Sequence, residues 1–383
     1  MKANRFKLAI DASRNRSGGA VAHMIGFLRA AEPERFGCGQ VHVWSYDRLL
    51  RALPERSWLV RHNPQELERG ILTQISWQRW QLHEEVGRAG CGILLNTDAG
   101  TVSKFRPSVT MSRDMLSYEP GEIGRYGWSK ARVRLWLLRH MQNRSLRAAD
   151  GAIFLTHYAA RIIQASCGEL KNIAIVPHGV RDEFRDLNRT LDWPEPGTRD
   201  LRCLYVSNAA PYKHQWEVVR AVEALRREGY RVSLKLVGGG QGKSQVQLEA
   251  QIARSDPEGC FVTQTEFLPH DALLAVLEEA DLFIFASSCE NMPNTLVEGM
   301  AAGLPIACSA RGPMPEVLRD GGVFFDPEND QSIAKALRRL IDSSDLRRQV
   351  AARGRALAND FSWKRCANET FAFVAETHRK CTT

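Results

Sequence analysis

Two glutamates, Glu290 and Glu298, are separated by seven residues in the stretch SSCENMPNTLVEGMAAGLPIACSA, residues 287–310. The first follows an apolar run, residues 281–286, that is typical of a buried strand. The second lies inside the helix expected to begin near residues 292–295. A helix start offers unpaired N–H groups and a partial positive charge, which suit a phosphate, and a carboxylate further along the helix can accept hydrogen bonds from hydroxyls. Together these residues predict a site for a sugar nucleotide.

Polar loops after other predicted strands hold further candidates. Lys213 follows the strand expected at 203–207 and precedes a helix, where its charge opposes the helix dipole. This position indicates an anionic ligand such as a diphosphate, and an exposed loop lysine is the alternative. Arg113 and Asp114 follow the strand at 109–111. Asp114 is a candidate hydrogen-bond partner or base for an acceptor hydroxyl, with a loop cap as the alternative.

Three weaker signals come from a histidine and two glycine-containing loops. His178 ends the strand at 173–176 and is either a ligand contact or a turn residue. Gly18 and Gly19 follow the first strand, where they allow a ligand close to the backbone or form a tight turn. Gly239 belongs to a loop that fails the Walker A pattern because Val237 stands where glycine is required.

The elements that must position these residues alternate along the chain. Short apolar runs alternate with helical patterns, which predicts parallel sheets covered by helices. We therefore expect an α/β protein with two doubly wound, Rossmann-like domains that face each other across a cleft. Residues 191–197 contain two prolines and a glycine and are expected to connect the domains. The expected strands are residues 8–11, 41–45, 93–96, 109–111, 151–155, 173–176, 203–207, 233–237, 261–263, 281–286, 306–309 and 323–325.

Composition and length agree with a two-domain globular protein. The chain has 383 residues and a net charge of +8, and its apolar runs are too short to span a bilayer. The nine cysteines show no C-x-x-C spacing, which predicts reduced thiols and no zinc site. The N-terminus has no signal-peptide pattern, so we expect a cytoplasmic protein.

A basic segment at residues 125–147 contains seven lysines and arginines and no acid. Val133, Trp136, Leu137 and Met141 recur within it at helical spacing. One interpretation is a surface helix with a solvated basic face. Another is peripheral contact with an anionic membrane or a lipid-linked substrate on its inner face. Nucleic acid is not an expected partner, since the chain has no recognisable nucleic-acid-binding module.

The Glu290-x7-Glu298 pair resembles the signature of retaining glycosyltransferases of family 4, which have the GT-B fold. The similarity covers nearly the whole chain. It is most specific in residues 281–309 and extends to Gly18-Gly19, 175–180, 205–213, 236–240, 312–316 and 361–363. The resemblance implies an acceptor-binding domain at 1–181 and a nucleotide-sugar-binding domain at 182–361. It also implies that a final helix, 362–383, packs back on the first domain.

The resemblance also implies roles for the candidate residues. Glu298 would bind the ribose and Glu290 the donor sugar, while Lys213 would neutralise the diphosphate. Gly19 would lie against the donor. Other implied donor contacts are the base-holding segment Phe267 and Leu268, and the loop residues Asn291, Met292, Pro293, Asn294 and Thr295.

Two positions depart from the family pattern. Asn208 stands where an arginine usually accompanies the lysine, and Arg113 stands where a histidine usually precedes the aspartate. An amide supplies no charge, so diphosphate binding would rely on Lys213 or on another cation such as Arg311 or Arg113. Arginine stays protonated and cannot serve as a general base.

The predicted activity is transfer of a hexose or deoxyhexose, with retention, from a UDP-, GDP- or dTDP-linked donor to a saccharide acceptor. We expect a lipid-linked acceptor in surface polysaccharide or O-antigen assembly. No cofactor or obligatory metal is expected, because the chain contains no Asp-x-Asp. The alternatives are a non-catalytic sugar-nucleotide-binding subunit and a GT-B-type sugar-nucleotide epimerase.

Overall fold

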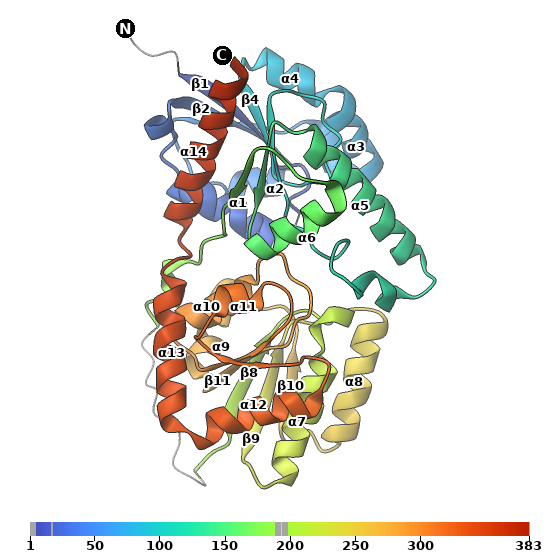
Figure 1. Ribbon diagram of the computed structural model, residues 1–383, viewed down its shortest axis with the longest axis vertical. Coiled ribbons are helices and arrows are strands. Elements are labelled where there is room, and N and C mark those ends of the chain that lie inside the picture. The colour runs from blue at the N-terminus through green and yellow to red at the C-terminus, as the bar shows by residue number, and fades with distance from the viewer. Residues whose placement is uncertain (1–4, 17, 188–192, 194–197, 383) are drawn as a thin grey trace. The chain divides into compact units, whose positions relative to one another are not determined.

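The computed structural model describes residues 5–16, 18–187, 193 and 198–382. The chain divides into two compact units, residues 1–179 with 362–383, and residues 180–361 (Figure 1). Unit 2 thus begins at Val180, two residues before the expected boundary. The predicted connector at 191–197 lies outside the described residues, apart from Trp193.

Unit 1 is built on a seven-stranded parallel sheet with the strand order β3-β2-β1-β4-β5-β6-β7. Its strands are β1 Phe6–Asp11, β2 Cys38–Trp44, β3 Leu59–His62, β4 Ile93–Asn96, β5 Ser108–Met111, β6 Gly151–Phe154 and β7 Ile173–Ile175. Its helices are α1 Gly18–Ala30, α2 Asp47–Ala52, α3 Ile71–Trp80, α4 Leu82–Arg88, α5 Lys130–Ala148, α6 His157–Cys167 and α14 Trp363–Thr382.

Unit 2 repeats this architecture with a six-stranded parallel sheet in the order β10-β9-β8-β11-β12-β13. Its strands are β8 Leu201–Val206, β9 Val232–Val237, β10 Val262–Thr265, β11 Leu282–Phe285, β12 Ile306–Ser309 and β13 Val323–Phe325. Its helices are α7 Gln215–Arg227, α8 Lys243–Ser255, α9 His270–Glu279, α10 Asn294–Ala301, α11 Met314–Leu318, α12 Asp330–Asp342 and α13 Ser344–Ala358.

Strand order reverses direction once in each sheet. The chain leaves β1 toward β2 and β3, then returns to β4 and continues to β7 on the other side. Because parallel crossovers are right-handed, helices from the two halves of a sheet lie on opposite faces. In unit 2 the corresponding point lies between β8 and β11. Ligands of open α/β sheets bind beyond the carboxyl ends of the strands at this point.

The central strands are almost wholly buried, as continuous apolar runs predict. The predicted pair of α/β domains is confirmed, and each of the twelve expected strands corresponds to an observed one. The strand at β3 was not predicted. It is a four-residue edge strand, and none of its residues is fully buried, so its apolar signal is weak.

The C-terminal helix α14 belongs to unit 1, although 182 residues of unit 2 precede it in the chain. It packs against α1, where the rings of Phe27 and Phe371 stack with centroids 5.3 Å apart. Close approach is possible here because Gly26 has no Cβ, which would lie 2.4 Å from the indole of Trp363.

Candidate functional site

The strand order of unit 2 brings the loops that carry Lys213 and Glu290 together. β8 and β11 are neighbours in the sheet, and these residues follow the carboxyl ends of the two strands. Lys213 ends a short 3-10 helix, Pro211–Lys213, and Glu290 lies in the loop between β11 and α10. Both residues therefore stand at the point where ligands of this architecture bind.

The Lys213 ammonium and the Glu290 carboxylate form a direct ion pair. Their side chains are only 10% and 16% exposed, so water screens the pair weakly. The ammonium also lies 5.7 Å from the centre of the Phe285 ring. The sequence predicted both residues but not their contact. Because of this ion pair, each side chain holds the other in place.

A network of hydrogen bonds fixes the loop that carries Lys213. The Tyr205 hydroxyl donates to the carbonyl oxygen of Lys213 over 2.8 Å. His214 has a left-handed backbone, with φ of 47°, and its Nε2 lies 2.8 Å from the Ser288 hydroxyl. The backbone N–H of Ser288 donates to the carbonyl of Tyr212 over 2.8 Å. The loops after β8 and β11 are thus joined on either side of the ion pair.

Helix α10 begins beside the same strand ends. No side chain caps its start and no acidic residue occupies its first turn, so its N-terminal partial positive charge is not offset locally. The Thr295 hydroxyl donates to the carbonyl of Val206, the last residue of β8, over 3.3 Å. The preceding residues Asn291, Met292 and Pro293 are buried. This arrangement can receive a phosphate at the helix start.

Glu298 lies one turn into α10 and remains partly exposed. Burial raises the pKa of its carboxyl to about 7, and the Arg181 guanidinium opposes this shift. A carboxyl poised near neutrality accepts hydrogen bonds when it is ionised. Arg181 was not a predicted site residue, and nothing in its local sequence distinguishes it from other surface arginines.

The glycine loop after β9 approaches the loop after β8. Gly238 has φ of +114°, a conformation that side chains rarely adopt, and a Cβ there would lie 2.5 Å from the carbonyl oxygen of Ser207. Gly239 faces Glu266 at ordinary contact distance. Beyond β10, Phe267 is 83% exposed and Leu268 is partly exposed. An exposed ring at a strand end is available for stacking on a base.

Asn208 and Arg311, an amide and a cation considered for the diphosphate, differ in their surroundings. Asn208 is exposed after the end of β8. Arg311 is about half exposed and lies 3.3 Å from a carboxylate oxygen of Asp326. Its loop lies near Ser288, since a Cβ on Gly312 would be 3.6 Å from the Ser288 carbonyl oxygen.

Unit 1 holds the remaining predicted residues. Gly18 and Gly19 are exposed at the start of α1. Arg113 donates from Nη2 to Asn15 Oδ1 over 2.6 Å. Asp114 accepts from the backbone N–H of Leu116 over 3.0 Å, and burial raises the pKa of its carboxyl.

His178 is buried in unit 1, and its ring stacks on that of His23 with centroids 4.5 Å apart. Sequence reasoning did not single out His23, His214 or Asn15. Each of them has an ordinary sequence context, and their importance arises from contacts with residues distant in the chain.

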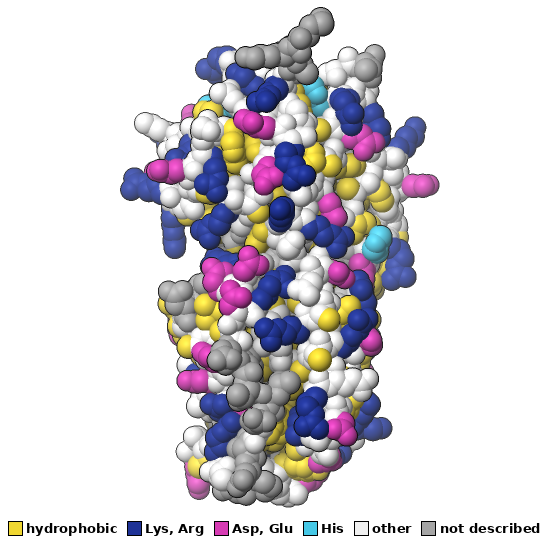
Figure 2. Space-filling model, turned by 90° about the vertical axis from the view of Figure 1, so that its left-hand side faces the viewer, with side chains coloured by type: hydrophobic (Ala, Val, Ile, Leu, Met, Phe, Trp, Pro, Cys, Tyr) yellow, Lys and Arg dark blue, Asp and Glu magenta, His cyan; other side chains and the backbone are white. Residues whose placement is uncertain are grey.

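The basic segment 125–147 includes α5, which carries a surface of exposed apolar side chains. We call Trp128, Val133, Trp136 and Leu137 the α5 patch; they are 98%, 59%, 63% and 55% exposed. They do not belong to the core, and basic residues are interleaved with them along the segment; Trp128 lies just before α5 begins. On the side of unit 1 that carries α14, basic and acidic side chains are interspersed instead (Figure 2). No helix in the described part of the chain is long and apolar enough to cross a membrane.

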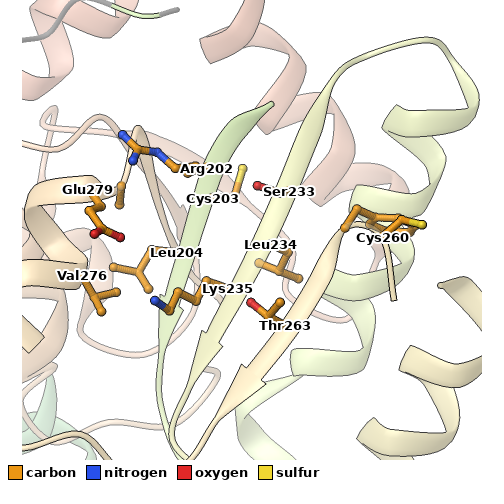
Figure 3. Close-up of a pocket in the computed structure, with 12 residues that line it drawn as sticks. Arg202, Cys203, Leu204, Ser233, Leu234, Lys235, Cys260, Thr263, Val276 and Glu279 are labelled. Carbon is orange, nitrogen blue, oxygen red and sulfur yellow. The ribbon is translucent and has the colours of Figure 1, made fainter. Parts of the chain in front are cut away.

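A separate pocket of about 210 Å³ lies on the first residues of β8, β9 and β10 beside α9 (Figure 3). Lys235, Glu279 and Val276 line it together with Arg202 and Cys260. Arg202 and Lys235 lie within strands β8 and β9, and Val276 and Glu279 lie in α9, whereas Lys213 and Glu290 follow the carboxyl ends of their strands.

Comparisons with known proteins show the family and the fold of the chain. The model of the family "Glycosyl transferases group 1" matches residues 194–357, which include Lys213, Glu290 and Glu298. The glycogen synthase of Mycobacterium tuberculosis is 31% identical over 305 residues, 71% of this chain and 69% of that protein. The O-antigen chain mannosyltransferase B of Escherichia coli is 26% identical over 168 residues. That match covers 44% of each chain, so it spans less than half of this relative's length.

Among solved structures, Anabaena Alr3699/HepE in complex with UDP and glucose has a TM-score of 0.69. It is 18% identical, and the likeness covers 95% of this chain and 98% of that one. This likeness confirms the predicted GT-B architecture of two Rossmann-like domains.

Proposed function

The chain belongs to the group 1 glycosyltransferases, and on that premise we propose that it moves a hexose or deoxyhexose from a nucleoside-diphosphate sugar to a saccharide acceptor. The Lys213–Glu290 ion pair beside the uncapped start of α10 carries this proposal. This site combines the Lys213 cation, the α10 helix dipole and the Glu290 carboxylate beyond the ends of β8 and β11. A sugar diphosphate needs the first two at its phosphates and the third at its hydroxyls.

The proposed reaction retains the anomeric configuration. The bond between the anomeric carbon and the phosphate oxygen breaks, and the acceptor oxygen bonds to that carbon on the same face. The acceptor proton passes to the leaving phosphate oxygen. Lys213 and the α10 dipole stabilise the charge that develops on this oxygen. Glu290 holds the donor sugar, Glu298 the ribose, and Asp114 hydrogen bonds the acceptor hydroxyl.

The donor and the acceptor are proposed from the relatives and from α5. HepE was crystallised with UDP and glucose, and the E. coli relative is an O-antigen chain mannosyltransferase. The first supports a nucleotide-sugar donor, and the second supports a role in surface polysaccharide assembly. The α5 patch supports a lipid-linked acceptor at the cytoplasmic face of an anionic membrane, because exposed tryptophans among basic residues suit a lipid interface.

The function is tested by a thermal-shift panel of UDP, GDP and dTDP with their hexose and deoxyhexose conjugates, followed by transfer assays with the conjugate that binds. We expect a saccharide product whose new linkage keeps the anomeric configuration of the donor sugar by NMR. Glu290→Ala should abolish transfer. Binding without transfer or donor hydrolysis would indicate a non-catalytic subunit, and a rearranged sugar nucleotide would indicate an epimerase.

Membrane contact is tested with vesicles of phosphatidylglycerol and phosphatidylcholine at low and high salt. We expect wild-type protein to sediment with anionic vesicles at low salt and to be released as salt rises. Val133→Ser and Trp136→Ser should weaken this binding. Val246→Ser is the matched control, since Val246 on α8 of unit 2 is also 63% exposed. Equal sedimentation of all variants would exclude α5 as the contact surface.

A further inference from the structure

Three loops of unit 1 converge beyond the carboxyl ends of β1, β4 and β5. These strands are neighbours in the sheet, and the strand order reverses between β1 and β4. Arg113 from the third loop donates to Asn15 from the first, and Thr97 from the second donates to the same Asn15 oxygen over 3.1 Å. A Cβ on Gly100 would lie 2.8 Å from Arg14 Nη1 and 2.7 Å from Asp98 Oδ1, so these side chains also meet here.

The convergence gathers hydrogen-bond donors that have no partner among the described residues. They are Arg113 Nε and Nη1, Arg14 Nη2, Asn15 Nδ2 and Ser112 Oγ, and each of these atoms is buried. Neither ring nitrogen of His23, which is 1% exposed, has a described partner either. Burial lowers the pKa of this ring well below its usual value, so it is neutral and offers one donor and one acceptor. We call these five residues the donor cluster. Groups of this kind are rare inside proteins, because burial without a partner forfeits their hydration.

The cluster is cationic, and its two arginines, Arg14 and Arg113, form no direct ion pair with the acids nearby in the described part of the chain. The charge of Asp98 nevertheless acts on Arg113. The side chain of Asp98 accepts the Gly100 N–H over 2.7 Å. Asp11 accepts from Ser13 and Gln78, and Asp114 accepts from its own loop and from Gln142. The acids at this edge are therefore engaged by neutral donors.

Burial lowers the pKa of the Arg113 guanidinium, and Asp98 opposes this shift. A buried guanidinium with two unpartnered nitrogens is costly unless an anion arrives to accept its hydrogen bonds. Arg113 keeps part of its surface exposed, which leaves an approach for such a group.

We propose that the donor cluster binds an anionic group, a carboxylate or a phosphate, carried by the sugar that this enzyme transfers or receives. Planar guanidinium groups bind either anion through two parallel hydrogen bonds. This inference rests on the proposed transferase activity, and it names an acidic or phosphorylated sugar as the substrate class. Arg113 then acts as a residue that determines specificity.

Binding of free sugars to the full chain tests the inference by calorimetry, with glucuronate, glucose 6-phosphate, glucose and inorganic phosphate as probes. We expect at least one anionic sugar to bind ten-fold or more tightly than glucose. Arg113→Met and Arg14→Met should each remove most of that preference. Arg88→Met is the matched control, because Arg88 is an exposed arginine of α4 in the same unit and should change nothing. Whichever anionic sugar binds more tightly identifies the anion.

Arg113→Lys guards against a folding defect in Arg113→Met, since it keeps the charge and loses the two parallel hydrogen bonds. We expect it to bind the preferred anionic sugar more weakly than wild type does. Equal binding of glucose and both anionic sugars would overturn the inference, as would unchanged affinity in Arg113→Met or, if that variant fails to fold, in Arg113→Lys. Binding of inorganic phosphate without preference for an anionic sugar would overturn it as well.

Glu298→Gln separates this inference from the transferase proposal. It should weaken binding of the nucleotide sugar and leave binding of the anionic sugars intact. If no nucleotide sugar binds while the anionic preference persists and depends on Arg113, the transferase proposal fails and the anion site stands.

Discussion

At the scale of single residues, the surroundings of the Glu298 carboxyl change its acidity strongly. Its pKa of about 7 arises because α10 and its neighbours bury the group, while only Arg181 favours the ionised form. An unfolded glutamate titrates near 4.5. The folded chain therefore holds this proton more tightly than the unfolded chain does.

Glu298→Gln tests two expected effects of this glutamate, one on the pH dependence of stability and one on binding of the nucleotide sugar. Between about pH 4.5 and pH 7, wild-type stability should fall as pH rises, because ionisation is easier in the unfolded chain. This titration changes the free energy of unfolding by at most about 3 kcal/mol. The variant should lack this change when urea unfolding at pH 5 is compared with urea unfolding at pH 8. Loss of a charged acceptor should weaken donor binding by about 10- to 100-fold. Identical pH profiles would contradict the raised pKa.

A double-mutant cycle measures the Lys213–Glu290 pair. Lys213→Met leaves a largely buried carboxylate without its partner, which should cost about 3–5 kcal/mol of unfolding free energy. Adding Glu290→Gln should recover most of that stability but not transfer activity. Additive losses of unfolding free energy would show that the two side chains do not interact.

At the scale of elements, the start of α14 packs closely against the segment that follows β7 in unit 1. A Cβ on Gly179 would lie 2.2 Å from the backbone nitrogen of Trp363. Backbone atoms cannot move aside as a flexible side chain does. Glycine is therefore required for this approach.

Gly179→Ala should destabilise unit 1 by about 1–3 kcal/mol through overpacking. Gly87→Ala is the matched control. Gly87 lies in α4, and a Cβ there has open space, so alanine should be neutral or stabilise the helix by up to about 1 kcal/mol. Thermal unfolding of the two variants measures both effects. A Tm for Gly179→Ala that equals wild type would contradict the close packing.

At the scale of the whole molecule, two parallel sheets of the same architecture each place polar loops at the point where the strand order reverses. In unit 2 those loops hold the Lys213–Glu290 pair, and in unit 1 they hold the donor cluster. The proposed chemistry uses side chains and a helix dipole to stabilise the leaving diphosphate.

We therefore expect sugar transfer to continue in excess EDTA. The basis is the proposed charge stabilisation by Lys213 and α10, together with the lack of Asp-x-Asp in the sequence. Rates measured with and without chelator check this expectation. A loss of activity that magnesium or manganese restores would contradict it.

The sequence by itself determined the α/β class, the paired parallel sheets, the loops that hold Lys213 and Glu290, and the helix that holds Glu298. This was possible because buried strands and helix starts leave local patterns of apolar, glycine and proline residues. Only the tertiary structure decided that Lys213 contacts Glu290, that α10 buries Glu298 and that five scattered residues form the donor cluster. These contacts join loops from strands that are neighbours in space and distant in the chain, and no local pattern records them. The edge strand β3 escaped prediction for a related reason, since its pairing with β2 leaves only a weak apolar signal.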